Sequence, residues 1–419
     1  MVTPNSPRAL LNKVLAQPGI ESSAAAVELR GAAPVTIAIV TLGTFGDILP
    51  FATLGEHLQL SGHVVIVLSN TNHETFVRSR GLNFVGVSES EDPASGFDPD
   101  KFMIRDAIPA YKRITTVIAD LMTRTPKLVI VNRSGNWGGL FASERYGLPL
   151  VSVVLQPSSV FENGHPVTSP VLSAVNRFRT SLGLAPLDSG GILEPACEVI
   201  SMFPAWFGYP ESRSSAAGSC VGFPFQNSST NPLPRKIQDM VLRHGPPVVF
   251  SAGTNVVDTN FFDLADEFAS ITGFPVVAVG RGGGRKFLSK AQAYPFIDHG
   301  RLFPVARLII HNGGIGVIAQ AMRAAVPQIV IPSVWDQPDN ARRVVDLGIG
   351  QVVSPDTASC KELIRASYAA AALERKSLFA IAAAVRRQSG VIEACRIINS
   401  RILQLFRITS KLTGTIGSS

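Results

Sequence analysis

The sequence predicts an α/β fold with two doubly wound domains, and three observations lead to this prediction. The chain has 419 residues, whereas a single hydrophobic core rarely grows past about 250–300 residues. Apolar, β-branched runs that are typical of buried strands alternate with segments of helical periodicity. This alternation occurs twice, with a Pro-rich join at Pro224–Pro234. Alternating strands and helices form parallel sheets with right-handed crossovers, so each half is expected to be a doubly wound domain.

Composition and charge restrict the class of protein. Apolar residues make up 46% of the chain, which supports packed cores, and charged residues make up only 16%. The net charge is +7, but the basic residues are scattered, which argues against a nucleic-acid-binding protein. The positive charge still permits attraction to an anionic ligand or peripheral contact with a membrane. The sequence has no apolar run long enough to span a membrane, and its four cysteines form no CxxC pair, so we expect a cytoplasmic protein with reduced thiols.

The first domain is expected over residues 34–224, after a disordered extension over residues 1–33 without the apolar core of a signal peptide. A strand is predicted first, then a turn rich in glycine, and then a helix that ends at Gly62. Further strands follow. The predicted elements are a strand at Val35–Thr41, a turn at Gly43–Asp47, a helix at Ile48–Ser61, and strands at His63–Ser69, Lys127–Asn132 and Pro149–Val154.

The second domain is expected over residues 235–390, after a linker over residues 225–234. Its predicted strands are Pro247–Ala252, Pro275–Gly280, Arg307–His311 and Gln328–Pro332, and its predicted helices are Asn260–Thr272, Ile315–Ala325, Asp339–Leu347 and an Ala-rich stretch at Lys361–Arg387. A last helix is predicted over residues 391–408, and a flexible tail over residues 409–419.

A glycine turn after the strand Arg307–His311 is the strongest candidate for a binding site. Gly313 and Gly314 let the backbone approach a ligand, and the helix that begins near Ile315 has unpaired N–H groups in its first turn. Such a helix start suits a phosphate, to which His311 is expected to donate a hydrogen bond. The spacing fits neither a Walker loop nor a dinucleotide fingerprint. The alternative is a tight turn whose glycines serve packing alone.

The next strand leads into three further candidate residues. Asp336 and Gln337 offer acceptors and a donor at the carboxyl end of that strand, which suits sugar hydroxyls. The alternative role for both is to cap the helix Asp339–Leu347. Trp335 is expected either to form an apolar platform for a ring or to lie in the core.

The segment from His311 to Val344 has the pattern HxGGxGxxxxAxxxxVPQxxxPxxxDQxxNAxRV, and it resembles the donor-binding segment of family 1 glycosyltransferases of the GT-B fold. Gly43–Pro50 (GTFGDILP) resembles the amino-terminal turn of the bacterial members. Phe203–Phe207 and Gly222–Pro224 are similar to the rhamnosyltransferase chain of rhamnolipid synthesis. The resemblance covers the chain from about Val35 to Arg401.

The resemblance implies two Rossmann-like domains that face a cleft, with a carboxyl-terminal helix that packs back on the first domain. It also implies inverting transfer of a hexose or deoxyhexose from a nucleoside diphosphate sugar to a hydroxyl of a hydrophobic acceptor. The donor would be similar to UDP-glucose, or a dTDP-linked deoxysugar such as rhamnose. The resemblance implies no cofactor and no obligatory metal.

The resemblance also implies roles for particular residues. Asp47 is expected to be the catalytic base, and its alternative role is the N-cap of the following helix. The expected diphosphate-binding residues are His311, Gly313, Gly314, Gly316, Ser251, Gly253 and Thr254; those for the sugar are Asp336, Gln337 and Trp335; those for the nucleoside are Gln320 and Arg281; and those for the acceptor are Gly46, Trp137, Gln156 and His165.

Three departures from the family pattern leave the nucleotide preference open. Gln320 stands where many members have Glu, Asn312 where a second His is common, and Ala325 where Gly is usual. Other classes remain as alternatives: a sugar-nucleotide epimerase of similar fold, or a noncatalytic partner that binds a sugar nucleotide or lipid. A nicotinamide-dependent oxidoreductase is disfavoured, because no GxGxxG follows Val35–Thr41.

Overall fold

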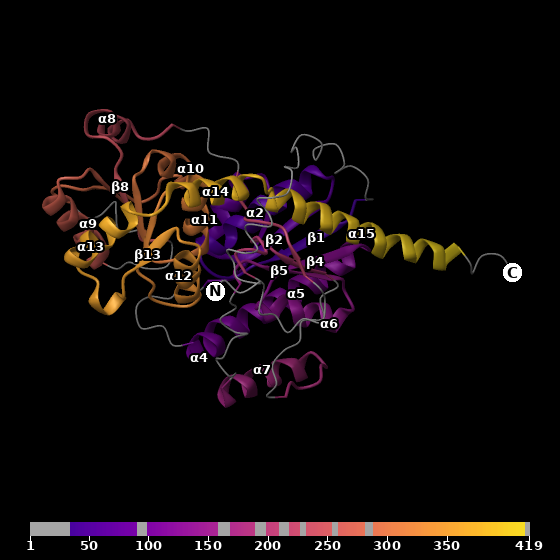
Figure 1. Cartoon of the computed structure of the whole chain (residues 1–419). Helices are drawn as coiled ribbons and strands as arrows, with labels where there is room; N and C mark the ends of the chain where they lie inside the picture. Colours follow the sequence, from indigo (N-terminus) through magenta and orange to yellow (C-terminus); the bar gives the residue numbers. More distant parts are fainter. Residues whose placement is uncertain are drawn as a thin grey trace, which may run out of the picture.

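The computed structural model describes residues 34–89, 99–157, 168–188, 198–208, 218–226, 232–253, 259–280 and 288–414. The predicted extension at residues 1–33 and part of the predicted linker lie outside these residues. The described chain forms two sheets in which all paired strands are parallel, and helices cover both of them (Figure 1). The prediction of two doubly wound α/β domains is therefore confirmed.

The first sheet has seven strands in the order β3-β2-β1-β4-β5-β6-β7. The strands are β1 Thr36–Val40, β2 Val64–Asn70, β3 Asn83–Ser88, β4 Leu128–Arg133, β5 Leu150–Val154, β6 Glu198–Ser201 and β7 Ser219–Cys220. The second sheet has six strands in the order β10-β9-β8-β11-β12-β13. They are β8 Val248–Ser251, β9 Val276–Val279, β10 Gln292–Tyr294, β11 Leu308–His311, β12 Gln328–Val330 and β13 Gly350–Val352.

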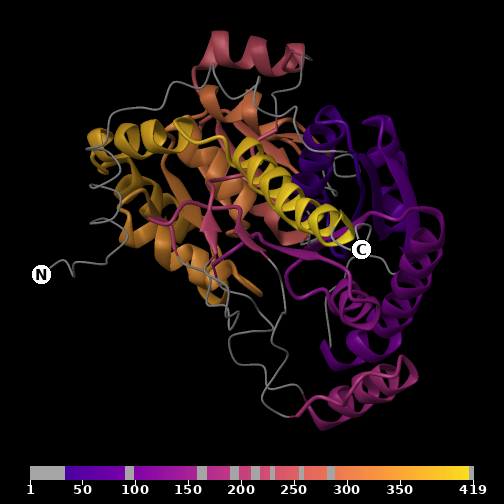
Figure 2. The ribbon, with the colours of Figure 1, turned by 90° about the vertical axis from the view of Figure 1, so that its right-hand side faces the viewer.

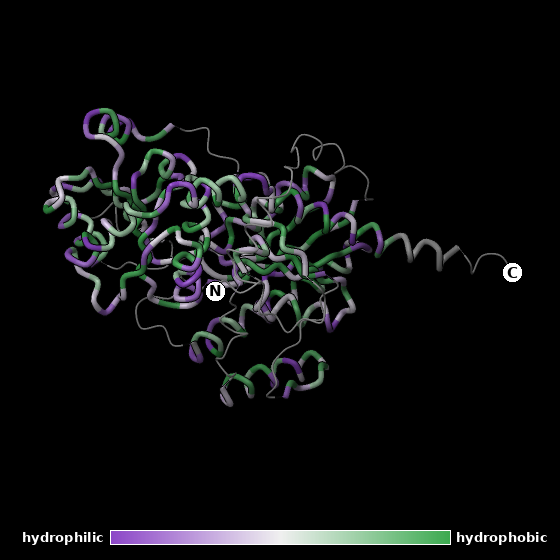
Figure 3. The backbone as a smooth tube through the Cα atoms, in the orientation of Figure 1, coloured by the Kyte–Doolittle hydropathy of each residue, from purple (hydrophilic) through white to green (hydrophobic). Residues whose placement is uncertain are grey.

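The interior of both domains is mainly hydrophobic, as the green segments of Figure 3 show. Every residue of β1 and of β8 is buried, because helices cover both faces of a doubly wound sheet. All strands predicted from the sequence are present. The prediction missed β3, β6, β7, β10 and β13, of which several have only two to four residues and so show too little of a period to be read.

Helices connect the strands. In the first domain they are α2 Phe45–Leu60, α3 Glu74–Ser79, α4 Pro99–Phe102, a π-helix at Met103–Ala107, α5 Ile108–Arg124, α6 Trp137–Tyr146 and α7 Ser169–Ser181. In the second they are α8 Arg235–His244, α9 Thr259–Thr272, α10 His299–Leu302, α11 Ile315–Ala324, α12 Gln337–Asp346, α13 Cys360–Ala371 and α14 Arg375–Arg386, followed by α15 Gly390–Gly414.

Three helix predictions need correction. The first helix begins at Phe45 rather than Ile48, because Thr44 and Asp47 form a capping box that satisfies its first N–H groups. The Ala-rich stretch is two helices, α13 and α14, and the break between them carries neither Gly nor Pro that could have marked it. The last helix reaches Gly414, beyond the predicted start of the flexible tail.

The last helix, α15, leaves the second domain and packs on α2 of the first, as predicted (Figures 1 and 2). Its apolar residues Cys395, Ile398 and Ile402 belong to the same core cluster as β1 and α2. A polar contact accompanies this packing, since Asn399 Oδ1 lies 2.8 Å from His63 Nε2. No helix in the described part of the chain is long and apolar enough to cross a membrane.

A separate hydrophobic cluster joins the two domains. Phe203, Trp206 and Phe207 follow β6 and are fully or almost fully buried. They pack in one cluster with residues of α11, α12 and α14 from the second domain. The domains are thus held against each other by apolar packing as well as by α15.

Candidate functional site

The Asp47 carboxylate is fixed in the turn that follows β1. Its Oδ2 accepts hydrogen bonds from the backbone N–H of Thr44 at 2.8 Å and from Thr44 Oγ1 at 3.1 Å. Gly43 has a φ of +135°, and a Cβ at this position would collide with that carboxylate oxygen, so the turn requires glycine. Asp47 is the third residue of the helix, and Thr44 is the N-cap, so the alternative role of Asp47 as the N-cap was wrong.

Arg133 is a residue of this site that sequence reasoning missed. It ends β4, the strand next to β1, and its Nε donates to Asp47 Oδ1 at 2.9 Å. The side chains of Arg133 and Asp47 are 22% and 18% exposed, so the ion pair is largely shielded from water. The only signal for Arg133 in the sequence was its position at the end of a predicted strand. That position becomes informative only once this strand is known to neighbour β1.

The glycine turn after β11 leads directly into α11, as predicted. Gly313 has a φ of +91°, and a Cβ there would collide with Val330. Gly314 is the N-cap of α11 and has no side chain to cap the first N–H groups. The helix start that follows it therefore keeps the donors that an anion needs, and Gly316 at this start is exposed.

His311 does not have the free donor that was predicted. The ring is fully buried, Nδ1 accepts a hydrogen bond from the N–H of Gly313 at 3.0 Å, and Nε2 lies 3.0 Å from Gln328 Oε1. Burial lowers the pKa of His311 from 6.5 to about 4, with the charge of His299 adding to this and Gln328 opposing it. The neutral ring shapes the Gly313 turn, and this corrects the expected hydrogen bond from His311 to phosphate.

The two predicted phosphate turns lie side by side and are tied together. Strands β8 and β11 are neighbours in the sheet, with Ser251 beside His311. Asn312 Nδ2 donates to the carbonyl oxygen of Ala252 at 3.1 Å. Asn312, which stands where a second His was expected, therefore connects the two turns. Ser251 is buried, and its Oγ lies 3.3 Å from His299 Nε2. Gly253 follows with a φ of +68°, and Thr254 lies outside the described residues.

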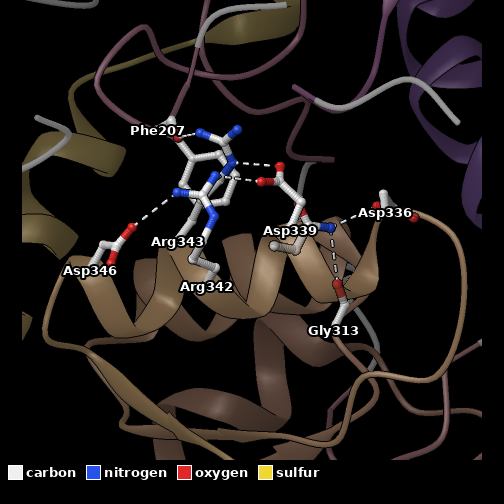
Figure 4. Close-up of polar contacts among 8 residues, drawn as sticks. Phe207, Gly313, Asp336, Asp339, Arg342, Arg343 and Asp346 are labelled. Carbon is white, nitrogen blue, oxygen red and sulfur yellow. Dashed lines mark hydrogen bonds and ion pairs between the residues drawn. The ribbon is translucent and has the colours of Figure 1, made fainter. Parts of the chain in front are cut away.

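Asp336 is linked to the Gly313 turn through Asn340. The Asn340 side-chain amide is buried, and its Nδ2 donates to Asp336 Oδ2 at 2.6 Å and to the carbonyl oxygen of Gly313 at 3.0 Å (Figure 4). Asp336 occupies the N-cap position of α12 but makes no side-chain capping bond, so its expected alternative role was wrong. Its carboxylate is thereby held next to the expected diphosphate site.

Gln337 and Trp335 form the turn before α12. Gln337 Oε1 accepts hydrogen bonds from the N–H groups of Ser333 at 2.9 Å and Val334 at 3.1 Å, so this oxygen shapes the turn. Only the Nε2 donors of Gln337 remain for a sugar. Trp335 is half-buried with a φ of +60°, a conformation that bulky residues rarely adopt and that concentrates at functional sites.

Charges from both domains act on Asp336. The pKa of Asp336 is raised from 3.8 to about 6. Burial and the negative charge of Asp47 raise it, whereas hydrogen bonds, including that from Asn340, and the charge of Arg133 lower it. Asp47 and Arg133 follow or end strands of the first sheet, and Asp336 follows β12 of the second. The carboxyl ends of the two sheets therefore face each other at this point, where ligands bind in doubly wound folds.

An arginine of α12 fastens the domain junction. Arg343 Nη1 donates to the carbonyl oxygen of Phe207 in the first domain at 2.8 Å, and its Nε donates to Asp339 at 2.8 Å (Figure 4). Although burial alone would raise the pKa of Asp339, hydrogen bonds from Arg342 and Arg343 hold it below its usual value. Sequence reasoning did not single out Arg343, although the family pattern includes it.

The remaining predicted residues divide into three groups. Gly46 is exposed beside Asp47, Gln156 is half-buried after β5, and Gln320 is half-buried on α11. Trp137 packs in the core near Tyr111 and Phe141 and is 7% exposed, and its contact with the acceptor stays a prediction. Arg281 and His165 lie outside the described residues.

Comparison with known proteins agrees with this geometry. Residues 290–390, which contain the Gly313 turn and Asp336, match the family model "Erythromycin biosynthesis protein CIII-like, C-terminal domain". O-mycaminosyltylonolide 6-deoxyallosyltransferase of Streptomyces fradiae is 24% identical over 86% of this chain and 96% of its own length. Sterol 3-beta-glucosyltransferase UGT80B1 of Arabidopsis thaliana is 24% identical over 76% of this chain and 60% of its own length.

Solved structures share the fold. The glycosyltransferase of kitacinnamycin superposes with a TM-score of 0.73 at 19% identity and covers 88% of this chain and 100% of its own. Glycosyltransferase VinC, in complex with dTDP, has a TM-score of 0.59 at 18% identity and covers 88% of this chain and 99% of its own. This chain therefore has the GT-B fold of these glycosyltransferases, and residues 290–390 are similar to the carboxyl-terminal domain of the matched family.

Proposed function

We propose that this protein is an inverting glycosyltransferase that moves a sugar from a nucleoside diphosphate to a hydroxyl of a hydrophobic natural product or lipid. One observation carries the proposal: the Asp47 carboxylate of the first domain lies within electrostatic reach of Asp336, which Asn340 ties to the Gly313 turn. A candidate base and a candidate diphosphate site thus meet where the two sheets face each other.

The reaction follows from this arrangement. Asp47 takes the proton from the acceptor hydroxyl, and the hydroxyl oxygen attacks the anomeric carbon of the sugar. The bond from that carbon to the diphosphate breaks, and the diphosphate leaves with the bonding electrons. The N–H groups at the start of α11 are fixed donors that stabilise the charge that develops on it. A single displacement inverts the anomeric configuration.

The sugar and the acceptor belong to the proposal. Asp336 and the Nε2 donors of Gln337 hold sugar hydroxyls, and residues 34–224 hold the acceptor. The relatives act, by name, on O-mycaminosyltylonolide and on a sterol, and VinC was solved with dTDP, which supports a hydrophobic acceptor and a dTDP-linked sugar. A UDP-linked sugar stays the alternative donor. A closer relationship to the rhamnosyltransferase of rhamnolipid synthesis, a cytoplasmic location and contact with a membrane surface stay predictions.

The test begins with a screen of UDP- and dTDP-sugars for protection against thermal unfolding. A ligand at 100 times its dissociation constant adds about 2.7 kcal/mol to the free energy of unfolding. Donors that protect are then incubated with hydrophobic alcohols, and products are identified by mass spectrometry and their anomeric configuration by NMR. A glycoside of retained configuration contradicts the inverting mechanism. Conversion of the donor without an acceptor would indicate the epimerase instead.

A further inference from the structure

Arg133 gives the expected base a cation as its partner. The two side chains come from different strand ends, 86 residues apart in the sequence, and meet in a single ion pair of 2.9 Å. Arg133 is held at the end of β4, whose register with β1 pairs Asn132 with Val40. The guanidinium is therefore presented by the rigid centre of the sheet rather than by a loop.

The hydrogen bonds to the Asp47 carboxylate differ between its two oxygens and indicate which one can take up a proton. A carboxylate oxygen accepts about two hydrogen bonds. Oδ2 already accepts two, both from Thr44, so its lone pairs are occupied. Among the residues that the structure describes, only Arg133 donates to Oδ1, so this oxygen keeps one position. Oδ1 is thus the oxygen that meets the acceptor hydroxyl, and the Arg133 bond decides which way its remaining lone pair points.

We propose that Arg133 is a positioning residue of the transfer reaction, which orients Oδ1 of Asp47 toward the acceptor and acts as the counterion of Asp47. The inference rests on the proposed function, because it needs Asp47 as the base. Arg133 itself touches neither donor nor acceptor in this role.

The charges around Arg133 support this role. When Asp47 takes the proton from the acceptor hydroxyl, the electron pair of the O–H bond becomes the new bond to the sugar, and Asp47 loses its charge. The charge of Arg133 also favours the ionised form of Asp336 across the junction. It acts on Tyr111 as well, whose pKa burial raises so far that the phenol stays neutral. The charge of Arg133 thus acts on a carboxylate of each domain, through an ion pair with Asp47 and at longer range on Asp336.

A purely structural role for Arg133, as a tie between the turn and β4, is the competing explanation. The two explanations differ in what the loss of Arg133 affects. A structural tie affects stability and both substrates. A positioning residue affects kcat, leaves the affinity for the diphosphate unchanged, and alters the pH profile.

The experiment compares Arg133→Ala and Arg133→Lys with the control Arg80→Ala. Arg80 forms an ion pair with Glu56, which lies in the second half of α2 in the same domain. The side chains of Arg80 and Glu56 are 22% and 31% exposed, similar to those of Arg133 and Asp47. For Arg133→Ala we expect kcat to fall by about 10²-fold, since small misplacements of reacting groups have effects of this size. The affinity for UDP or dTDP, measured by calorimetry, should stay within about threefold.

Two further readouts separate positioning from structure. Arg133 is one of the groups that lowers the pKa of Asp336, so its loss should move the acid limb of the kcat/KM profile to higher pH. Added guanidinium ion, below denaturing concentrations, should restore part of the kcat of Arg133→Ala and none in Arg80→Ala. Arg133→Lys keeps the positive charge but loses the planar guanidinium and its fixed N–H donors, so its kcat should be intermediate.

The inference is overturned if Arg133→Ala retains kcat within about threefold of the unmodified protein, or if its losses match those of Arg80→Ala. Should Arg133→Ala fail to fold by circular dichroism, Arg133→Lys decides, and an unchanged kcat in that variant overturns the inference. A fully active Arg133→Ala beside an inactive Asp47→Asn would leave the proposed function intact. The proposed function itself fails if the unmodified protein transfers no sugar.

Discussion

Asp336 in the second domain lies within electrostatic reach of Asp47 in the first, and the charge of Asp47 raises the pKa of Asp336. A change in the charge at position 47 therefore alters proton binding at Asp336. Because Asp47 follows a strand of the first sheet and Asp336 a strand of the second, this coupling exists only while the two domains are packed together. The geometry of the junction and the chemistry of the site are therefore linked.

The first prediction concerns Asp47. Replacement with Asn keeps the shape of the side chain and the bond from Thr44 but removes the proton acceptor. We expect kcat to fall by about 10²–10⁴-fold, the usual contribution of a general base, with little change in the affinity for the nucleoside diphosphate. Steady-state kinetics and calorimetry measure the two quantities. Near-normal turnover in Asp47→Asn would show that another group takes the proton.

The sequence was sufficient for the fold because its signals were local. The buried runs at β1, β8 and β11 and the glycines at 313 and 314 report on their own neighbourhoods. The Thr44–Asp47 capping box was equally local and could have placed the start of α2 correctly. Short strands and the break between α13 and α14 depend on tertiary packing, which the sequence pattern does not display.

The site was predicted less completely, for a related reason. Glycines and carboxylates at strand ends could be identified, but the partners of each side chain could not. Arg133 reaches Asp47 across neighbouring strands, and Gln328 occupies the ring nitrogen that His311 was expected to offer to phosphate. Such pairings need the strand order and the rotamers, so the residue types were informative and their hydrogen bonds were not.

A second prediction follows from the raised pKa of Asp336. A native carboxyl group with a pKa above its unfolded value binds protons more tightly when folded, so it lowers stability as pH rises through the interval between the two values. For Asp336 that interval runs from 3.8 to about 6. Asp336→Asn should therefore gain about 3 kcal/mol of stability relative to the unmodified protein between about pH 4 and pH 7.

Urea unfolding across this pH range measures the gain. The same variant should transfer sugar more slowly, because the ionised carboxylate holds the sugar in the proposed site. A constant stability difference at all pH values would mean that Asp336 titrates as an ordinary exposed carboxyl group.

The third prediction compares two neighbouring arginines. Arg343 is 8% exposed and donates to Phe207 across the junction, whereas Arg342 is 61% exposed, and both pair with Asp339. Removing one partner of a buried charged contact leaves the other unpaired, so Arg343→Met should lower the free energy of unfolding by about 2–4 kcal/mol. Arg342→Met should lower it by less than about 1 kcal/mol. Equal losses in urea unfolding would show that Arg343 does not fasten the junction.

The fourth prediction concerns His311. The neutral ring holds the N–H of Gly313, so His311→Ala should disturb the turn and weaken nucleoside diphosphate binding by about tenfold, or 1.4 kcal/mol. Because burial lowers the pKa of His311 to about 4, the ratio of the two affinities should be constant from about pH 6 to pH 8. Calorimetry at several pH values tests this. A ratio that falls toward one at high pH would instead indicate a charged His311 in contact with the phosphate.

The fifth prediction concerns Ala325, which stands where the family usually has glycine. It caps the end of α11 with a φ of +59°, in the left-handed region where a Cβ is unfavourable by about 1–2 kcal/mol. Glycine removes this strain but has a more disordered unfolded state, which offsets about 0.4–1 kcal/mol. Ala325→Gly should therefore raise the free energy of unfolding by about 0.5–1 kcal/mol, whereas Ala324→Gly, one residue earlier in the helix, should lower it by a similar amount. If both substitutions destabilise the protein equally in urea, the end of α11 is not strained at Ala325.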